Sequence, residues 1–313
     1  MSIMNDMIEC SVVICTYKPD WEKLRLTLKS ILMQEDCNYN IVITDDGSKI
    51  NFFDEIRDYL SKYHFNKYKL IANNQNQGTV QNILQGLRTC DGALVKPISP
   101  GDFLHGRHAL RTWIDYMYEH EEYVMSYCDA IYYRMVNGKV FPIKTLSQPQ
   151  SRKPNAEQYI LYGDLCLGAS TMVRRQTWLK YLEMLQGKVI YAEDFSYQVM
   201  LYCGDKIINI PKPLLLYEFG TGVSTSGSSF WAEKLHKDDE AIKQIILSIK
   251  PSVEVGKYSI NQYLRIKNDK TLFCRLKKLM LCPSKILFRF RREFFPRKTS
   301  IKTDKLFLDE LLD

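Results

Sequence analysis

The chain has 313 residues, of which 45% are hydrophobic and 25% are charged, and its net charge is +7 at pH 7. This length suits one large domain or one domain with an appendage, and the composition excludes a disordered chain. No window reaches the roughly 18 uncharged apolar residues of a membrane span, which argues against an integral membrane protein.

The N-terminus and the cysteines indicate the cellular compartment. Residues 1–15, MSIMNDMIECSVVIC, have neither the basic start nor the long apolar core of a secretory signal. The nine cysteines include no C-x-x-C pair, so we expect reduced and mostly buried thiols. The five histidines show no metal-ligand spacing. We therefore expect a cytoplasmic protein.

The first third of the chain alternates strands with helices. Short apolar runs predict strands at 10–17, 40–44, 68–72 and 93–98, and the first of these runs is β-branched. Asp20 opens a helix whose apolar residues recur at helical spacing, and another helix is predicted over 79–90. This alternation indicates a doubly wound α/β sheet.

Polar residues stand where three of these strands end. Thr16 closes the first strand, Asp45 and Asp46 follow the second, and Asp102 follows the fourth. Ligands of doubly wound sheets bind outside the carboxyl ends of the strands. We therefore expect these side chains to converge on one site.

Beyond residue 120 the pattern changes. Two strand-like runs meet at Asn137-Gly138, a pair that favours a tight hairpin turn. An apolar segment (166–175), a helix (176–185) and a final strand before a Gly/Ser/Thr-rich loop (218–229) follow. Between them, Glu193-Asp194 precede a helical run.

The C-terminal tail, from about residue 228, shows apolar residues at helical spacing in several separate segments. Residues 265–305 hold 14 Lys or Arg against three acidic residues, whereas the rest of the chain is net acidic. Such asymmetry indicates a distinct segment with its own partner.

Five motifs, in this order and at these separations, resemble glycosyltransferase family 2: SVVICTYKP, IVITDDGS, NQGTVQN, ISPGD and AEDFSYQ. The resemblance spans residues 9–225. It implies a GT-A fold, an α/β architecture whose doubly wound mixed sheet joins a Rossmann-like nucleotide-binding half to an acceptor half. We expect a catalytic domain over 1–227 and a basic, all-helical C-terminal domain over 228–313.

The resemblance also implies a nucleotide site. It assigns the binding positions to Thr16, Tyr17, Asp45, Asp46, Ser48, Gly78 and Asn82. A carboxylate suits this site because uracil N3–H and the ribose hydroxyls are donors. Taken alone, the Asp-Gly-Ser run at 46–48 is also an ordinary turn, and helix capping competes with ligand binding for Asn82.

The family's Asp-x-Asp motif is incomplete in this chain. Ser99 and Gly101 stand where its first acidic residues would be, and Asp102 stands at the last. The resemblance implies that Asp102 binds a divalent cation, Mn²⁺ or Mg²⁺, together with the donor diphosphate and water, with weakened metal dependence. The alternative is metal-free charge neutralisation by Lys96, Arg107 or basic residues of the tail.

Glu193-Asp194 match the family's acidic pair on the acceptor side. The resemblance implies that Asp194 is the general base, which takes the proton of the acceptor hydroxyl as that oxygen attacks C1 of the sugar. Glu193 would support it or bind the acceptor. The alternative is that both only cap or solvate the following helix. The loop 218–229 fits either a mobile lid over the donor or a plain interdomain linker.

The tail leaves three kinds of partner open. It could build a helical domain that forms a homo-oligomer or docks the acceptor, lie on an anionic membrane surface, or bind nucleic acid. The regular apolar faces over separate helices favour the first of these. We expect no nucleic-acid partner.

Together these features predict an inverting glycosyltransferase. It would move a hexose or an N-acetylhexosamine from a UDP-sugar to a hydroxyl of a growing glycan on a protein or lipid carrier. One alternative is a non-catalytic GT-A-like module that binds a sugar or a partner. The other is a lipid-linked polysaccharide glycosyltransferase that acts at the membrane, with peripheral contact at its inner surface.

Overall fold

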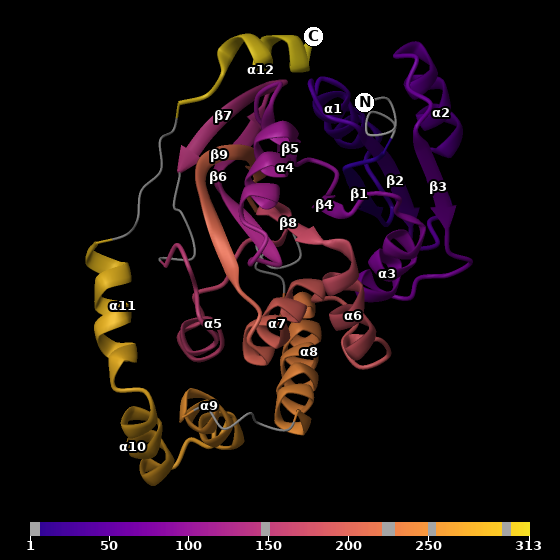
Figure 1. Cartoon of the computed structure of the whole chain (residues 1–313). Coiled ribbons are helices and arrows are strands. Elements are labelled where there is room, and N and C mark those ends of the chain that lie inside the picture. The colour runs from indigo at the N-terminus through magenta and orange to yellow at the C-terminus, as the bar shows by residue number, and fades with distance from the viewer. Residues whose placement is uncertain (1–6, 145–150, 221–228, 250–254, 296–301) are drawn as a thin grey trace.

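The computed structural model describes residues 7–144, 151–220, 229–249, 255–295 and 302–313. Its centre is a nine-stranded mixed sheet in the order β3-β2-β1-β4-β8-β6-β9-β5, with β7 paired to β6 outside this path (Figure 1). The predicted α/β class with strand–helix alternation is confirmed.

The N-terminal half of the sheet is parallel and matches the predicted bounds within one residue at each end. Its elements are β1 (Cys10–Thr16), α1 (Trp21–Leu32), β2 (Tyr39–Asp45), α2 (Phe53–Lys62), β3 (Tyr68–Ala72), α3 (Thr79–Thr89) and β4 (Leu94–Ile98). Successive strand residues point to opposite faces. Val13 packs in the core on the α3 side, whereas Val12 and Ile14 pack with α1 and α2. Both faces are covered, so these strands read as continuous apolar runs.

The second half of the sheet is mixed. It contains β5 (Phe103–Leu104), α4 (Ala109–Glu119), β6 (Met125–Val136), β7 (Lys139–Lys144), α5 (Ala156–Tyr162), η1 (Gly168–Ser170), β8 (Thr171–Arg174), α6 (Arg175–Leu185), η2 (Glu193–Phe195), α7 (Ser196–Cys203) and β9 (Ile207–Glu218). The predicted hairpin joins β6 to β7, and both turn residues, Asn137 and Gly138, have positive φ.

The tail is helical, as predicted: α8 (Ser229–Ser248), α9 (Val255–Arg265), α10 (Leu272–Leu281), α11 (Ser284–Phe294) and α12 (Lys305–Leu312). Ile242, Ile245 and Ile246 of α8 are buried in the same apolar cluster as the core between α3 and α6. The proposed domain boundary near 227 lies outside the described residues. No described helix is long and apolar enough to cross a membrane.

The last helix, α12, lies apart from the other tail helices (Figure 1) and packs against the sheet. In Figure 1, α12 lies at the top, and α9 and α10 lie at the bottom. Phe307, Leu308 and Leu311 of α12 are buried in a small apolar cluster with Phe103 and Tyr133, among others. The C-terminus is thus part of the packing around β5, β6 and β9.

Candidate active site

The candidate site begins at the carboxyl ends of the parallel strands β1 and β2. Thr16, the last residue of β1, stands beside Asp45, the last residue of β2. The hydroxyl of Thr16 donates a hydrogen bond to Oδ2 of Asp45 over 2.8 Å. Strand register therefore brings together two of the predicted nucleotide-binding residues.

Asp45 ties the loop after β2 to the loop after β1. It accepts hydrogen bonds from the backbone N–H of Ser48 at 2.7 Å and from the Ser48 hydroxyl at 2.8 Å. Oγ of Ser48 accepts in turn from the N–H of Lys18 at 2.7 Å. Tyr17, next to Lys18, is 47% exposed. Its ring is thus accessible to a ligand while its neighbours are fixed.

Asp46 anchors the start of α3. Its carboxylate accepts from Nδ2 of Asn73 at 3.0 Å and from the backbone N–H groups of Gln77 and Gly78, each at 2.8 Å. It is 3% exposed. A polar pocket of about 370 Å³ opens beside this loop, with Asn73, Gln77 and Gln81 in its wall. Asp46 thus shapes the loop between β3 and α3.

Asn82 braces the site from inside α3. Its Oδ1 accepts from the hydroxyl of Thr44 at 2.6 Å, and its Nδ2 donates to the Thr44 carbonyl at 3.1 Å. The N-cap of α3 is Gly78, so the capping role considered for Asn82 is wrong. At 2% exposure, Asn82 fixes β2 against α3.

Asp102 lies in the loop between β4 and β5. Its Oδ1 accepts from the backbone N–H of Glu218 at 3.2 Å, and its carbonyl accepts from the hydroxyl of Thr27 in α1 at 3.0 Å. Burial raises the pKa of this carboxyl to about 7, although the Glu218 N–H and the charge of Lys96 oppose the shift. These two hydrogen bonds join Asp102 and its backbone to α1 and β9.

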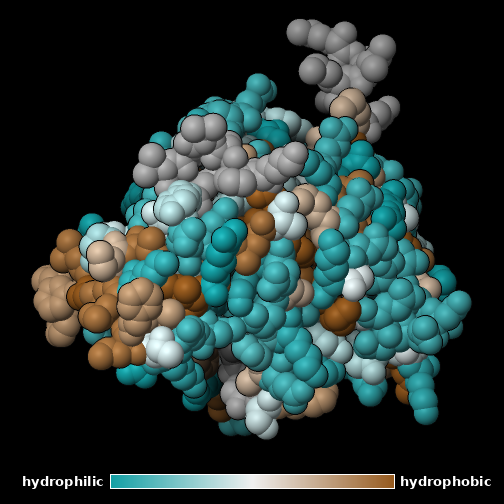
Figure 2. All heavy atoms as spheres, turned by 90° about the horizontal axis from the view of Figure 1, so that it is seen from below, coloured by the Kyte–Doolittle hydropathy of each residue, from teal (hydrophilic) through white to brown (hydrophobic). Residues whose placement is uncertain are grey.

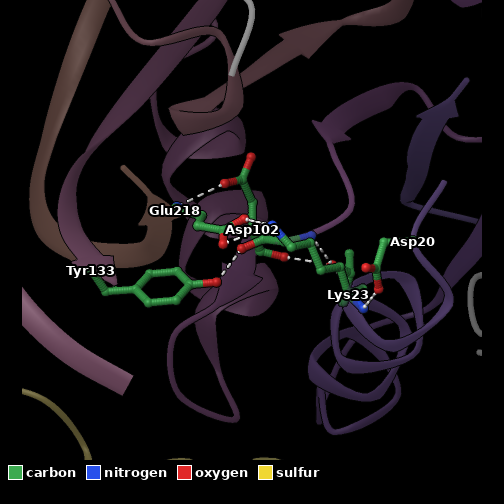
Figure 3. Close-up of polar contacts among 7 residues, drawn as sticks. Asp20, Lys23, Asp102, Tyr133 and Glu218 are labelled. Atoms are coloured by element: carbon green, nitrogen blue, oxygen red, sulfur yellow. Dashed lines mark hydrogen bonds and ion pairs between the residues drawn. The ribbon is translucent and has the colours of Figure 1, made fainter. Parts of the chain in front are cut away.

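A second carboxylate, missed by the sequence motif, lies beside Asp102. Figure 3 shows Glu218, at the end of β9, next to Asp102 and close to Lys23 of α1. Nζ of Lys23 lies 2.8 and 2.6 Å from the two Glu218 oxygens. A Cβ on Gly101 would lie 2.6 Å from Oε2 of Glu218. Gly101 therefore leaves room for an acidic side chain that arrives from another strand.

The carboxylate of Asp102 has the chemistry of a ligand for a divalent cation. Asp102 offers hard carboxylate oxygens, the donors that Mg²⁺ and Mn²⁺ prefer beside phosphates, whereas both oxygens of Glu218 bond Nζ of Lys23. The one group of His, Asp and Glu with ligand-like spacing in the described chain is elsewhere, at His236, Asp239 and Glu240 of α8. Its two carboxylates already bond Lys267 and Lys243, respectively.

Two basic residues considered for charge neutralisation are committed elsewhere. Lys96 is fully buried, and its Nζ donates to the carbonyls of Pro97 at 2.5 Å and Ala169 at 2.6 Å. Arg107 pairs with Glu35 at 2.9 Å and with Glu310 of α12. Neither side chain is free to meet a donor phosphate, so this part of the alternative is wrong.

The acidic pair opens η2, directly before α7. A Cβ on Gly168 of η1 would lie 3.8 Å from Oδ2 of Asp194 and 3.7 Å from Oε1 of Glu193, so both carboxylates face η1. Burial raises the pKa of both carboxyls, to about 6 for Asp194, and the charge of Asp194 raises that of Glu193 further. Such a raised pKa suits a general base near neutral pH.

A buried carboxylate from α8 holds the segment before this pair. Asp238, 2% exposed, accepts hydrogen bonds from three consecutive backbone N–H groups, those of Ile190 at 2.9 Å, Tyr191 at 2.7 Å and Ala192 at 2.9 Å. The carbonyl of Ile190 accepts from the N–H of Val80 in α3 at 3.0 Å. The acidic pair is therefore positioned by both the nucleotide half and the tail.

The structure thus brings most of the predicted residues together, whereas Asp102 bonds α1 and β9. Thr16, Asp45, Asp46, Ser48, Gly78 and Asn82 share one hydrogen-bond network, and Glu193 and Asp194 adjoin its α3 end. Most of the lid or linker segment 218–229 lies outside the described residues. The pattern missed Glu218 and Asp238, whose roles depend on contacts distant in sequence.

The family model described as "Glycosyl transferase family 2" matches residues 11–180. No curated protein matches the chain.

Solved structures of S. aureus TarS share the fold. TarS 1-349 aligns with a TM-score of 0.59 and 17% identity, over 90% of this chain and 81% of that one. Its complex with UDP-GlcNAc aligns with a TM-score of 0.58 and 16% identity, again over 90% and 81%. Its complex with UDP gives 0.57 and 13%, over 91% and 87%. The predicted GT-A fold is confirmed.

Proposed function

Because the chain belongs to glycosyltransferase family 2, we propose that it transfers a hexose or an N-acetylhexosamine from a UDP-sugar to a hydroxyl of a growing glycan on a protein or lipid carrier, with inversion at C1. The observation that carries this proposal is the pair Glu193 and Asp194, which faces η1 beside the start of α3. The proposal includes a cytoplasmic location and a catalytic domain that ends near residue 227.

Asp194 acts as the general base. The acceptor oxygen attacks C1 of the sugar while Asp194 takes its proton, and the bond between C1 and the diphosphate oxygen breaks to release UDP. The raised pKa of Asp194 supports this role because the carboxylate binds a proton more strongly than an ordinary aspartate does, yet is ionised at neutral pH. Glu193 supports the base or binds the acceptor.

The donor occupies the carboxyl ends of β1 and β2. Tyr17 packs on the base, and Asp45 and Asp46 fix the loops around the nucleotide. The choice of UDP is supported by the fold shared with TarS, whose structures include complexes with UDP-GlcNAc and UDP. Asp102 would hold Mn²⁺ or Mg²⁺, and the cation would supply positive charge to the leaving diphosphate.

Calorimetric titration of UDP, with Mn²⁺ and then with EDTA, tests the donor site. We expect tighter binding with Mn²⁺ and loss of that gain in Asp102→Ala. Equal binding in both conditions would contradict the metal proposal but keep the nucleotide site. Absence of binding would overturn the UDP assignment.

Asp194→Asn tests the base. We expect kcat to fall about 10²- to 10⁴-fold while UDP affinity stays unchanged, because the substitution removes proton acceptance from an otherwise preserved site. Asp58→Asn, at an exposed position of α2, is the matched control and should keep full activity. If the wild type shows no transfer with any UDP-sugar yet binds UDP, the non-catalytic sugar- or partner-binding module replaces this proposal.

A further inference from the structure

An unusually apolar surface covers α10 and α11. Of the 23 large hydrophobic side chains that are exposed in the described chain, ten lie within residues 272–295. These ten, which we call the tail face, are Leu272, Phe273, Leu276, Leu279, Met280, Ile286, Leu287, Phe290, Phe294 and Phe295. Figure 2 shows hydrophobic residues gathered at the left, the side on which α10 and α11 lie in Figure 1. A patch of this kind marks an interaction surface.

The sides of α10 and α11 opposite the tail face pack on the rest of the protein. Cys282, between them, is 1% exposed, and Phe288 of α11 packs on Tyr162 of α5 with ring centroids 5.1 Å apart. The hydroxyls of Tyr162 and Ser284 also form a hydrogen bond. The inner residues thus fix α10 and α11, so the tail face is a folded surface that points outward.

The tail face is surrounded by positive charge. Residues 272–295 carry seven basic side chains against the single carboxylate of Glu293: Arg275, Lys277, Lys278, Lys285, Arg289, Arg291 and Arg292. Lys278 bonds backbone carbonyls, and Lys285 bonds the Tyr263 hydroxyl. Within the described residues, none of the seven forms an ion pair with a carboxylate.

We propose that the tail face binds an anionic phospholipid bilayer surface. Its aromatic and aliphatic side chains would enter the headgroup and acyl boundary, while the surrounding Lys and Arg meet lipid phosphates. A second copy joined tail face to tail face would bring two clusters of like charge together. Nucleic acid would satisfy the charges but leave ten apolar side chains against water. Only the anionic bilayer matches both the apolar and the basic parts.

This contact bears on the acceptor class as well. A glycosyltransferase held on a bilayer reaches acceptors carried on lipid, so the contact favours the lipid carrier over the protein carrier. That last step rests on the proposed function, whereas the bilayer contact does not.

The experiment is co-sedimentation of the full-length protein with vesicles, without nucleotide. Vesicles of phosphatidylcholine alone are compared with vesicles in which about a third of the lipid is phosphatidylglycerol. We expect binding only to the anionic vesicles, weakened by salt. The triple variant Phe273→Ser, Leu276→Ser, Met280→Ser should bind at least about tenfold more weakly.

Matched variants separate the two contributions. Val136→Ser, Phe141→Ser, Ile143→Ser removes three other exposed apolar residues, from the β6–β7 hairpin, and should bind like the wild type. Arg275→Gln, Arg289→Gln, Arg291→Gln should also lose about tenfold, whereas Lys62→Gln, Lys139→Gln, Lys188→Gln, at exposed positions elsewhere, should lose far less.

Two outcomes would overturn the proposal. One is vesicle binding that both tail variants retain. The other is the absence of binding to anionic vesicles. If the protein then has a dilution-dependent size in light scattering that the Ser variant of the tail face abolishes, the face joins copies of the chain. Because UDP binding and transfer are measured separately, failure of this contact is distinct from failure of the proposed function.

Discussion

Asp46 and Asn82 illustrate how single residues act in this site. Both occupy positions that the sequence assigned to nucleotide binding, and both use their polar atoms on the protein itself. Asp46 holds the start of α3, and Asn82 holds Thr44 of β2. Their charge and amide groups therefore shape the loops that a nucleotide would meet, and Tyr17 is the exposed member of the set.

The acidic pair gives a prediction on pH and activity. We expect kcat/KM to fall as the pH drops below about 6, because burial raises the pKa of Asp194 to about 6 and a protonated carboxyl cannot take the acceptor's proton. A pH profile of kcat/KM for the acceptor, measured at saturating donor, checks this. A profile that stays flat down to about pH 4.5 would contradict the raised pKa of Asp194.

The same shift predicts that activity and stability change in opposite directions. The folded protein binds the proton of Asp194 more tightly than the unfolded chain does, so its ionisation destabilises the fold as the pH rises through and above the ordinary carboxyl range. Asp194→Asn should therefore raise the thermal midpoint at about pH 8 while it removes activity. Calorimetry checks this, and a lowered midpoint would contradict the assigned shift.

Asp238 is a positioning residue, which acts on the acidic pair through the backbone before it. Asp238→Asn keeps the shape of the side chain but removes the charge that three backbone N–H groups share. We expect a loss of about 2 kcal/mol in the free energy of unfolding and a lower kcat, because charge-assisted hydrogen bonds are stronger than neutral ones. UDP affinity should change little, which distinguishes displacement of Asp194 from loss of the donor site.

The control lies on the same helix. Glu233 of α8 is exposed and pairs with Lys237 at 2.8 Å. Glu233→Gln should change stability by less than about 0.5 kcal/mol, since exposed ion pairs contribute little. Equal effects of the two substitutions would remove Asp238 from its assigned role.

At the scale of elements, the site depends on close contact between the start of α3 and the segment before η2. Gly78 has a φ of +92°, and a Cβ there would lie 2.6 Å from the carbonyl oxygen of Ile190. We expect Gly78→Ala to separate the two segments, with a loss of about 2 kcal/mol in stability and weaker UDP binding. Denaturant unfolding and UDP titration measure the two effects.

Gly187 provides the matched control for this clash. It also has a positive φ, +73°, but a Cβ there would have no atom within 4 Å. Gly187→Ala should therefore cost only the backbone strain, about 1 kcal/mol, and leave UDP binding unchanged. If both variants behave alike, the contact between α3 and Ile190 does not shape the nucleotide site.

At the scale of the whole molecule, the C-terminal helix α12 packs against residues of the N-terminal half. Leu311 of α12 is fully buried with Phe103 and Tyr133, whereas Leu306 on the same helix is 84% exposed. Leu311→Ala should lower the free energy of unfolding by about 2–4 kcal/mol because it leaves a cavity, and Leu306→Ala should change it by less than about 0.5 kcal/mol. Denaturant unfolding compares them, and a mild effect at Leu311 would show that α12 is only loosely attached.

The sequence alone predicted the sheet of the first hundred residues, the 137–138 hairpin, the helical tail and the residues at the ends of β1 and β2. These features depend on local patterns: apolar strand runs, turn residues, helical spacing and ordered motifs. Only the tertiary structure showed that Glu218 lies beside Asp102 and that Asp238 holds the segment before the acidic pair. It also showed that Lys96 and Arg107 bond other groups of the protein and that α12 packs against the sheet. Each of these depends on contacts between segments distant along the chain, whose pairing is decided by packing of the whole fold.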